Sequence, residues 1–383
     1  MARRSPYRGS VTRTRDEDVC PGALQMHQAA DGVLARVRLP GGMISAAQLE
    51  ALAAAATRFA AGTLELTARG NLQLRGITDA AAVADTVAAA GLLPSATHER
   101  VRNIVASPLS GRVGGLADIR AWVDELDGAI QDDPVLAGLP GRFLFGIDDG
   151  TADTSGLAAD VGLHVLADGV ALLLAGHDTG IRLPGHEAVS GLLTIARRFV
   201  ELRGTAWRVS ELDDPDVLLT GYRSSAPAGG EFMLARPPVG WIEQADGAVA
   251  IGAAVPLGVL TARQAQFVAA IGAPVVITPR RSLLVCDLTE TVADTALRVL
   301  APMGLVFDQA SRWLDITSCV GIPGCERSRA DVRAEATRSA ESGAVTGRVH
   351  YAGCERACGS PAAGTVLVAS GDGYTPLDRP TVG

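Results

Sequence analysis

Four of the six cysteines in this 383-residue chain form two close pairs towards its C-terminal end. The pairs are Cys319 with Cys325 and Cys354 with Cys358. Each pair follows a short run with β-strand character, at residues 313–317 and 347–351. Glycine, proline and serine crowd the thiols, so the backbone can fold closely around a compact group. This stretch therefore predicts a metal site.

The spacing within each pair bears on which metal group the thiols suit. Structural zinc sites usually keep about two to four residues between paired cysteines, so that both sulfurs reach one ion. Here five residues separate the first pair and three separate the second, which favours a larger 4Fe-4S cluster. A structural zinc ion and four unrelated buried thiols are the alternatives. Cys20 and Cys286 are interpreted as packed thiols.

Composition argues against several classes of partner. The net charge of −8 argues against a nucleic-acid partner, and no apolar run approaches the ~18 residues of a membrane span. The polar start of the chain lacks the apolar core of a signal peptide, so a cytoplasmic protein is expected, in which thiols stay reduced. All 34 basic residues are arginine, so an anionic substrate has to be held by local arginines.

A pattern in the first third of the chain recurs in its second half. In both places a turn, a capped helix, a strand, a Thr-x-Arg sequence and another strand follow in the same order. Thr67-Ala-Arg69 corresponds to Thr278-Pro-Arg280, a match that is harder to attribute to chance than the alanine-rich helices. The first copy has the β-α-β-β-α order of a ferredoxin-like unit. The sequence therefore predicts an internally duplicated α+β fold.

The predicted organisation has six parts. They are a polar N-terminal arm (1–19), a ferredoxin-like half-domain (20–100), an α/β domain (101–223), a linker (224–238), a second ferredoxin-like half-domain (239–301) and a second α/β domain that carries the cluster (302–383). The first α/β domain is predicted to contain helices at 118–130 and 186–202, a strand at 142–147 and a hairpin of 161–166 with 170–174. Residues 32–39 alternate apolar and polar side chains, as a half-exposed strand does.

The pattern Cys-x5-Cys followed by Cys-x3-Cys, together with Thr67-Ala-Arg-Gly-Asn-Leu-Gln73, resembles the sulfite and nitrite reductase superfamily. The resemblance implies that the four paired cysteines hold a 4Fe-4S cluster. In that superfamily the last cysteine, here Cys358, often also bridges to a sirohaem iron. The resemblance further implies that each ferredoxin-like half-domain is followed by an α/β domain of the nitrite/sulfite reductase type.

The same resemblance implies an anion-binding site built around arginines. Arginine suits this role because its guanidinium binds carboxylates through two hydrogen bonds and stays charged. The predicted residues, with the neighbours that share their motifs, are Arg69, Asn71, Gln73, Arg102, Asn103 and Arg142. Ion pairs with the 42 acidic residues are the alternative role for each arginine. Sulfite reductases place two lysines, one residue apart, where this chain has Arg142 and Leu144, so a charge is lost and reduction of an inorganic anion is disfavoured.

Within the superfamily, the chain resembles the precorrin-3B synthases. The resemblance covers most of residues 20–370 and is carried by four segments: Cys20-Pro-Gly-Ala-Leu24, 30–42, Asp148-Asp149-Gly150 and Gly353-Cys-Glu-Arg-Ala-Cys358. It implies oxygen-dependent hydroxylation of precorrin-3A at C20, with closure of a lactone, in aerobic cobalamin biosynthesis. The implied partners are this tetrapyrrole, dioxygen and an electron donor such as a ferredoxin or a reductase. The family's usual Lys and His near the last cysteine pair are here Arg356 and Ser360.

The family resemblance also implies a mononuclear non-haem iron beside the cluster. Histidines or carboxylates would hold such an iron, but the six histidines show no metal-binding spacing, so its ligands are left unassigned. Asp148 and Asp149 are candidates for a catalytic role as ligand or proton donor, and a capping or turn role is the alternative. Two other functions remain open: a sirohaem-containing sulfite or nitrite reductase, and a non-catalytic iron-sulfur protein for electron transfer or redox sensing.

Overall fold

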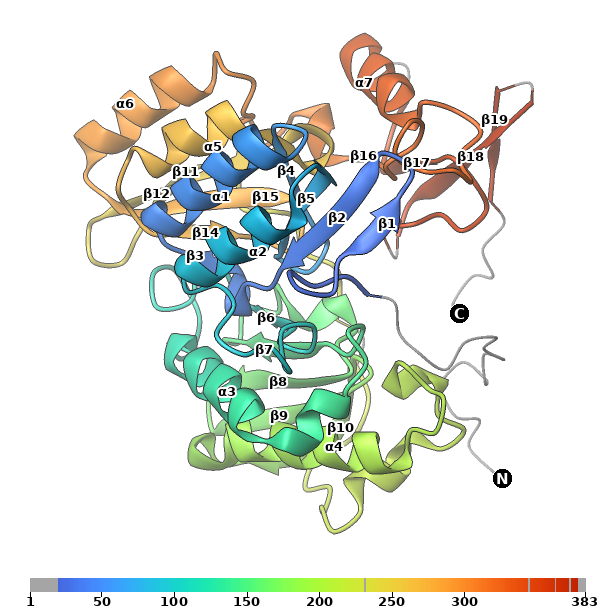
Figure 1. The fold of residues 1–383 in the computed structure, drawn as a ribbon. Helices are drawn as coiled ribbons and strands as arrows, with labels where there is room; N and C mark the ends of the chain where they lie inside the picture. The colour runs from blue at the N-terminus through green and yellow to red at the C-terminus, as the bar shows by residue number, and fades with distance from the viewer. Residues whose placement is uncertain (1–19, 231, 344, 362, 372, 378–383) are drawn as a thin grey trace.

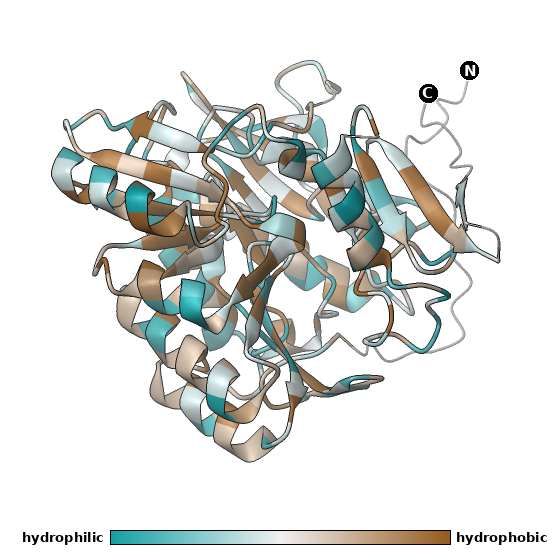
Figure 2. Ribbon diagram, turned by 90° about the horizontal axis from the view of Figure 1, so that it is seen from above, coloured by the Kyte–Doolittle hydropathy of each residue, from teal (hydrophilic) through white to brown (hydrophobic). Residues whose placement is uncertain are grey.

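The computed structural model describes residues 20–230, 232–343, 345–361, 363–371 and 373–377. The predicted N-terminal arm, 1–19, lies outside these described residues. Figure 1 shows two sheets flanked by helices, with a mostly green α/β segment on one side and a red C-terminal segment on another. The interior is apolar, and in Figure 2 the brown segments concentrate in the strands.

Two antiparallel five-stranded sheets form the centre of the molecule, and each contains a strand from the other half of the chain. The first sheet is ordered β1 (His27–Ala29), β2 (Gly32–Val37), β5 (Leu72–Ile77), β4 (Thr63–Leu66) and β13 (Val259–Thr261). The second sheet is ordered β11 (Gly240–Glu243), β12 (Val249–Ala254), β15 (Ser282–Leu288), β14 (Val275–Ile277) and β3 (Met43–Ile44). The two orders are equivalent, which confirms the duplication and shows that the two copies exchange one strand each.

Equivalent helices cover the two sheets. They are α1 (Ala46–Phe59) and α2 (Ala80–Ala89) in the first copy, and α5 (Ala262–Ala269) and α6 (Glu290–Leu300) in the second. Both α1 and α5 begin with a capping box, formed by Ser45 with Gln48 and by Thr261 with Gln264. Residues of both copies share one hydrophobic core, which includes Leu49 and Val285. The exchanged strands and the common core make the two half-domains a single packed unit.

Each half continues into an α/β segment. The first contains β6 (Ile104–Ala106), α3 (Arg120–Asp132), β7 (Phe145–Asp148), β8 (Val161–Leu166), β9 (Gly169–Leu174), β10 (His177–Leu183) and α4 (Ala188–Leu202). The second contains β16 (Ile316–Ser318), α7 (Val332–Ser342), β17 (Val349–Ala352), β18 (Thr365–Ser370) and β19 (Gly373–Pro376). In each, three strands pair in parallel and a fourth is antiparallel to the third. The duplication therefore extends beyond the half-domains.

Short 3-10 helices complete the fold, and two of them occupy equivalent turns before the exchanged strands. This pair is η1 (Pro40–Gly42) and η7 (Pro256–Gly258). The others are η2 (Pro134–Gly138), η3 (Ser155–Leu157), η4 (Gly185–Glu187), η5 (Val209–Glu211), η6 (Pro215–Leu219) and η8 (Arg312–Leu314). None of the described helices has the length and apolar character that crossing a bilayer requires.

The predicted elements are present, and their ends shift by a few residues. The hairpin of β8 with β9 is confirmed. The strand predicted at 142–147 starts only at Phe145, and Trp313 lies in η8 rather than in the strand before the first cysteine pair. The expectation that β2 is half-exposed is confirmed in part: Gly32, Val33 and Arg36 are half-buried, whereas Arg38, which follows the strand, is only 2% exposed.

Candidate functional site

The polar face of the first sheet forms the floor of the candidate site. Along β2, β5 and β4 alternate residues pack into the core, so the intervening residues point to the opposite face. Arg36, Gln73 and Glu65 lie in register across these three strands. Arg36 donates to Gln73 over 2.8 Å, and Gln73 donates to Glu65 over 3.0 Å. The alternation in residues 32–39 was the sequence signal for this face, but it did not show that the face is buried.

The cysteine loops contact this floor through arginines. Arg75 of β5 pairs with Asp31 and also donates to the carbonyl of Gly324, over 2.8 Å, between the first two cysteines. Arg333 of α7 pairs with Glu65, at the end of the row described above. Arg281, from the second copy, donates to the carbonyls beside both cysteine pairs. The floor that carries Gln73 therefore contacts the loops that carry the cysteines.

Arg69 lies at the tip of the turn between β4 and β5. The hydroxyl of Thr67 accepts hydrogen bonds from the amides of Arg69 and Asn71, at 3.3 and 3.1 Å, and so shapes the turn. Gly70 adopts a left-handed conformation, and a Cβ there would lie 2.8 Å from the carbonyl oxygen of Ile277. Among the described residues no hydrogen bond or ion pair reaches the Arg69 guanidinium. Burial, and then repulsion by Arg208, lowers the pKa of Arg69 to about 10.

The other predicted anion-binding residues differ in what they contact. Asn71 accepts the Leu39 amide and donates to Asn103, which donates in turn to the carbonyl of Gly141. Both amides are 1% exposed, so they join the first half-domain to the α/β segment. Arg102 forms two hydrogen bonds with Asp127 of α3, at 2.6 and 2.7 Å. Those contacts match the ion-pair alternative for Arg102, so Arg69 and Arg102 differ in their availability to a ligand.

Arg142 is exposed, and its guanidinium stacks over the ring of Trp207 at 5.0 Å. Leu144 is buried in a small apolar cluster with Val105 and Ala159. The position where sulfite reductases have a second lysine is therefore part of the hydrophobic packing in this chain. Close to Arg69, Arg208 pairs with the buried carboxylate of Asp160 at 2.6 Å. Sequence reasoning missed Arg208, because no motif marks it and only the fold brings it to Arg69.

The four paired cysteines lie on two loops that leave the same edge of the last sheet. Strands β16 and β17 are parallel, so the loops that follow them meet. None of the four forms a disulfide, and the amide of Gly353 donates to the sulfur of Cys319 over 3.2 Å. Partial burial and the nearness of the other three thiols raise the pKa of Cys358, whereas Arg356 opposes this. Four cysteine sulfurs on two adjacent loops are a donor set suited to a cationic metal group.

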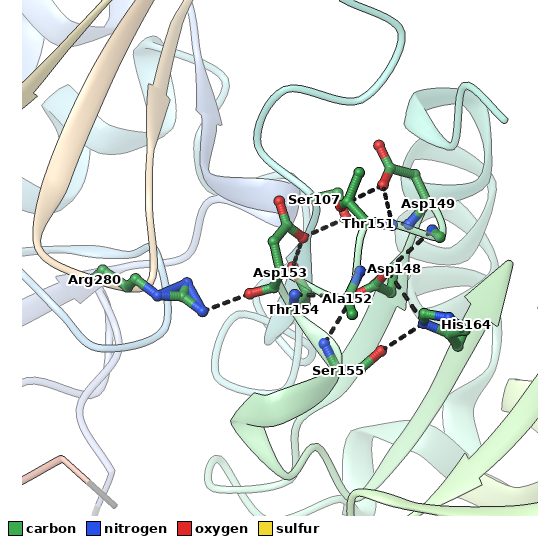
Figure 3. Close-up of polar contacts among 11 residues, drawn as sticks. Ser107, Asp148, Asp149, Thr151, Ala152, Asp153, Thr154, Ser155, His164 and Arg280 are labelled. Carbon is green, nitrogen blue, oxygen red and sulfur yellow. Dashed lines mark hydrogen bonds and ion pairs between the residues drawn. The ribbon is translucent and has the colours of Figure 1, made fainter. Parts of the chain in front are cut away.

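Asp148 and Asp149 lie in the loop after β7 (Figure 3). The Asp148 carboxylate accepts the amides of four residues: Gly150, Ala152, Thr154 and Ser155. Burial alone would raise its pKa, but hydrogen bonds from His164 and these amides outweigh burial and hold the pKa below its usual value. Asp149 accepts the amide and the hydroxyl of Thr151. These are the contacts of a turn, which was the alternative to a catalytic role, and the catalytic role itself stays a prediction.

Asp153 completes the acidic group in this loop. One oxygen of each of Asp148, Asp149 and Asp153 lies within 4.8 Å of the others, and this is the one such group of potential metal ligands among the described residues. Burial raises the pKa of Asp153. Figure 3 shows Arg280 of the second copy donating to the main-chain carbonyl of Asp153. Through this hydrogen bond the acidic loop contacts the turn of the second copy.

Comparison with known proteins relates this site to a family. Residues 26–89 match the nitrite/sulfite reductase ferredoxin-like half domain. A precorrin-3B synthase from Sinorhizobium sp is 30% identical over an alignment of 389 positions, and the match covers 96% of this chain and 83% of that protein. A ferredoxin--nitrite reductase from Synechococcus elongatus is 33% identical over 126 residues, covering 30% of this chain and 25% of that protein.

Among solved structures, the NirA protein of Mycobacterium tuberculosis superposes with a TM-score of 0.73. It is 22% identical, and the match covers 90% of this chain and 73% of that one. This likeness supports the fold, and the match to the Sinorhizobium protein along almost the whole chain supports the family. The chain therefore belongs to the precorrin-3B synthase family, within the nitrite/sulfite reductase superfamily of oxidoreductases.

Proposed function

We propose that this protein converts precorrin-3A to precorrin-3B in aerobic cobalamin biosynthesis, by hydroxylating C20 with dioxygen and closing a lactone with a ring acetate. In the overall balance, one oxygen atom of dioxygen enters the product. The other is reduced by two electrons from the donor, takes up two protons and leaves as water. The observation that carries the proposal is the buried Arg69 guanidinium, which has no hydrogen-bond or ion-pair partner among the described residues. A substrate with many carboxylates matches that charge.

Arginines of the floor supply the binding chemistry. Arg69 provides a guanidinium at the tip of its turn, and Arg36 and Arg38 provide two more from β2 and the residue after it. A carboxylate gains two charge-assisted hydrogen bonds from one guanidinium, each worth about 1.5–3 kcal/mol. Desolvated arginines gain most from such a partner, because an unpaired buried charge is unfavourable. These residues would orient the macrocycle through its carboxylates.

Cys319, Cys325, Cys354 and Cys358 would hold a 4Fe-4S cluster. In a tetrahedral zinc site the sulfurs lie about 3.8 Å apart, because each Zn–S bond is about 2.3 Å. No three of these four sulfurs, all within the described residues, lie within 4.8 Å of one another. The gaps of five and three residues within the two pairs favour a cluster over a single zinc ion. A bound cluster would supply single electrons, while Gly353 and the arginines that contact the loops hold the thiols beside the floor.

The mononuclear iron that the family resemblance implies has no fitting ligand set among the described residues. The acidic loop is the one compact group of potential ligands there, and four amides together with His164 already surround the oxygens of Asp148. That loop also contacts Arg280 of the second copy.

The proposal is tested with protein purified without air and supplied with precorrin-3A, an electron donor and ¹⁸O-labelled dioxygen. Mass spectrometry is expected to find one labelled oxygen atom in the tetrapyrrole product. The sirohaem reductase alternative predicts sirohaem absorption in the purified protein and reduction of sulfite or nitrite. An electron carrier predicts the absorption of a cluster and no turnover of either kind. Protein with an intact cluster that leaves precorrin-3A unchanged would overturn the proposal.

A further inference from the structure

The sulfur of Cys20 is hydrogen-bonded to two arginines. Arg36 donates to it from Nη1 and Arg38 from Nη2, each over 3.3 Å. Cys20 is half-buried and forms no disulfide. Cationic neighbours that donate to a sulfur favour the thiolate over the thiol. These contacts differ from those of the packed thiol expected from the sequence, whereas Cys286 is fully buried in an apolar cluster, as expected.

The loop that carries Cys20 is held firmly in place. The carboxylate of Glu99 accepts the amides of Ala23, Leu24 and Gln25, at 2.6, 2.8 and 2.9 Å. Gly22 has no room for a side chain, because a Cβ there would lie 2.4 Å from an oxygen of Glu99. Glu99 is therefore a positioning residue that fixes the path of the chain directly after Cys20.

Arg38 provides an independent sign of a ligand. It is 2% exposed, its Nε donates to the carbonyl of Arg100, and its Nη1 has no hydrogen-bond partner among the described residues. Burial lowers the pKa of Arg38 to about 10, and the nearby Cys20 opposes this. Because Nη1 and Nη2 belong to the same guanidinium, the unsatisfied donor lies next to the Cys20 sulfur. Arg69 also interacts electrostatically with both Cys20 and Arg38.

We propose that Cys20 is a thiolate that serves as the resting counter-ion of a carboxylate subsite formed by Arg36, Arg38 and Arg69. An incoming carboxylate takes the open donor of Arg38 and competes with the sulfur for the guanidinium groups. The identity of the natural ligand as a tetrapyrrole carboxylate rests on the function proposed above, whereas the state of the sulfur does not. Between turnovers the Cys20 thiolate partly balances the positive charge of these guanidinium groups.

The test uses cluster-loaded protein, in which Cys20 and Cys286 are the cysteines not assigned to the cluster. Limiting iodoacetamide is added at pH 7, and the thiolate displaces iodide to form a thioether. Tryptic peptides 16–36 and 282–298 report the two cysteines separately by mass spectrometry. Cys20 is expected to react at least about tenfold faster than Cys286, because the thiolate is the reactive form. Equal rates would overturn the proposal.

Variants test the cause of this reactivity. Arg36→Gln is expected to slow alkylation of Cys20 several-fold, and the matched control Arg58→Gln, at an exposed position of α1, is expected to leave the rate unchanged. Cys20→Ser keeps the guanidinium groups and removes the competing anion, so it is expected to bind uroporphyrin I, an octacarboxylic tetrapyrrole, several-fold more tightly than the wild type. Unchanged or weaker binding by Cys20→Ser would mean that the sulfur is no counter-ion.

Protection experiments separate this proposal from the proposed function. Uroporphyrin I or glutarate, added before iodoacetamide, is expected to slow modification of Cys20 and not that of Cys286. Protection by glutarate without protection by uroporphyrin I would support the carboxylate subsite and contradict the tetrapyrrole substrate. Fast alkylation with no protection by either acid would overturn the counter-ion role.

Discussion

The two copies of the Thr-x-Arg turn show how a duplicated fold divides its tasks. In both copies the threonine hydroxyl accepts the amide of the arginine two residues on, Arg69 in the first and Arg280 in the second. The next residue is left-handed in both, with φ of 67° at Gly70 and 57° at Arg281. The backbone of the turn is therefore the same, and the difference lies in what the side chains meet.

In the second copy the arginines form structural hydrogen bonds to main-chain carbonyls. Arg280 donates to the main-chain carbonyls of Ala235 and Asp153, and Arg281 donates to the carbonyls of Ser318 and Gly359 beside the cysteines. In the first copy Arg69 has no such partner among the described residues. The turn of the second copy thus contacts the cysteine loops, whereas the turn of the first copy keeps a cation available for a ligand.

The largest expected effect is loss of the cluster from the second half. Cys325→Ser is expected to abolish the visible absorption of the cluster and to destabilise the second α/β segment, since four ligands are required. Cys20→Ser is the matched control and is expected to keep full iron and sulfide. Iron and sulfide analysis of both proteins makes the measurement, and a fully loaded Cys325→Ser protein would show that this ligand is misassigned.

The next effect compares the equivalent glycines at the join between the copies. A Cβ at Gly42 would lie 2.0 Å from the carbonyl oxygen of Ile277, whereas a Cβ at Gly258 would lie 3.1 Å from that of Leu66 and near the flexible side chain of Arg281. Both glycines are left-handed. Gly42→Ala is expected to lower the free energy of unfolding by more than about 3 kcal/mol, and Gly258→Ala by about half of that. Equal losses in urea unfolding would contradict the tighter contact at Gly42.

A smaller effect concerns the pH dependence of stability that is caused by Cys286, the buried thiol of the second copy. Burial raises the pKa of Cys286 to about 11, so the unfolded chain loses this proton first as the pH rises. The contribution of Cys286 to the free energy of unfolding is fully present below about pH 8.5–9. It is lost as the pH rises towards 11, a change of roughly 3 kcal/mol. Cys286→Ala is expected to flatten the fall of unfolding free energy in this range. Parallel pH curves for the two proteins would contradict this.

The smallest expected effects come from replacing each of the two arginines, Arg69 and Arg280, by glutamine in turn. Arg69→Gln is expected to weaken binding of uroporphyrin I by about tenfold or more and to leave the melting temperature unchanged or raised, because it removes a buried cation that has no hydrogen-bond partner among the described residues. Arg280→Gln is expected to keep the affinity and to lower the free energy of unfolding by about 1–3 kcal/mol, because two carbonyls lose their donor. Calorimetric binding and thermal unfolding measure both variants. The same profile for the two variants would show that the turns are not specialised.

Much of the fold could be predicted because its signals are local. The helix cap at Ser45, the glycine and proline turns and the repeated Thr-x-Arg each act within a few residues, and all are present. The exchange of β3 and β13 could not be predicted, since both strands are short and pair with partners far along the chain. Arg102 and Arg69 looked equivalent in their motifs, and only the position of α3 gave Asp127 to one of them.

By itself, the sequence determined that the chain is a duplication, which family it resembles and which four cysteines form two close pairs along the chain. Repeats and spacings depend only on the order of the residues. The tertiary structure decided which arginines contact main-chain carbonyls and which is open to a ligand, that Arg38 is buried, and that Cys20 lies between two guanidinium groups. The physical reason is that the availability of a charge depends on its neighbours in space. For Arg69, Arg280 and Cys20 those neighbours come from distant parts of the chain.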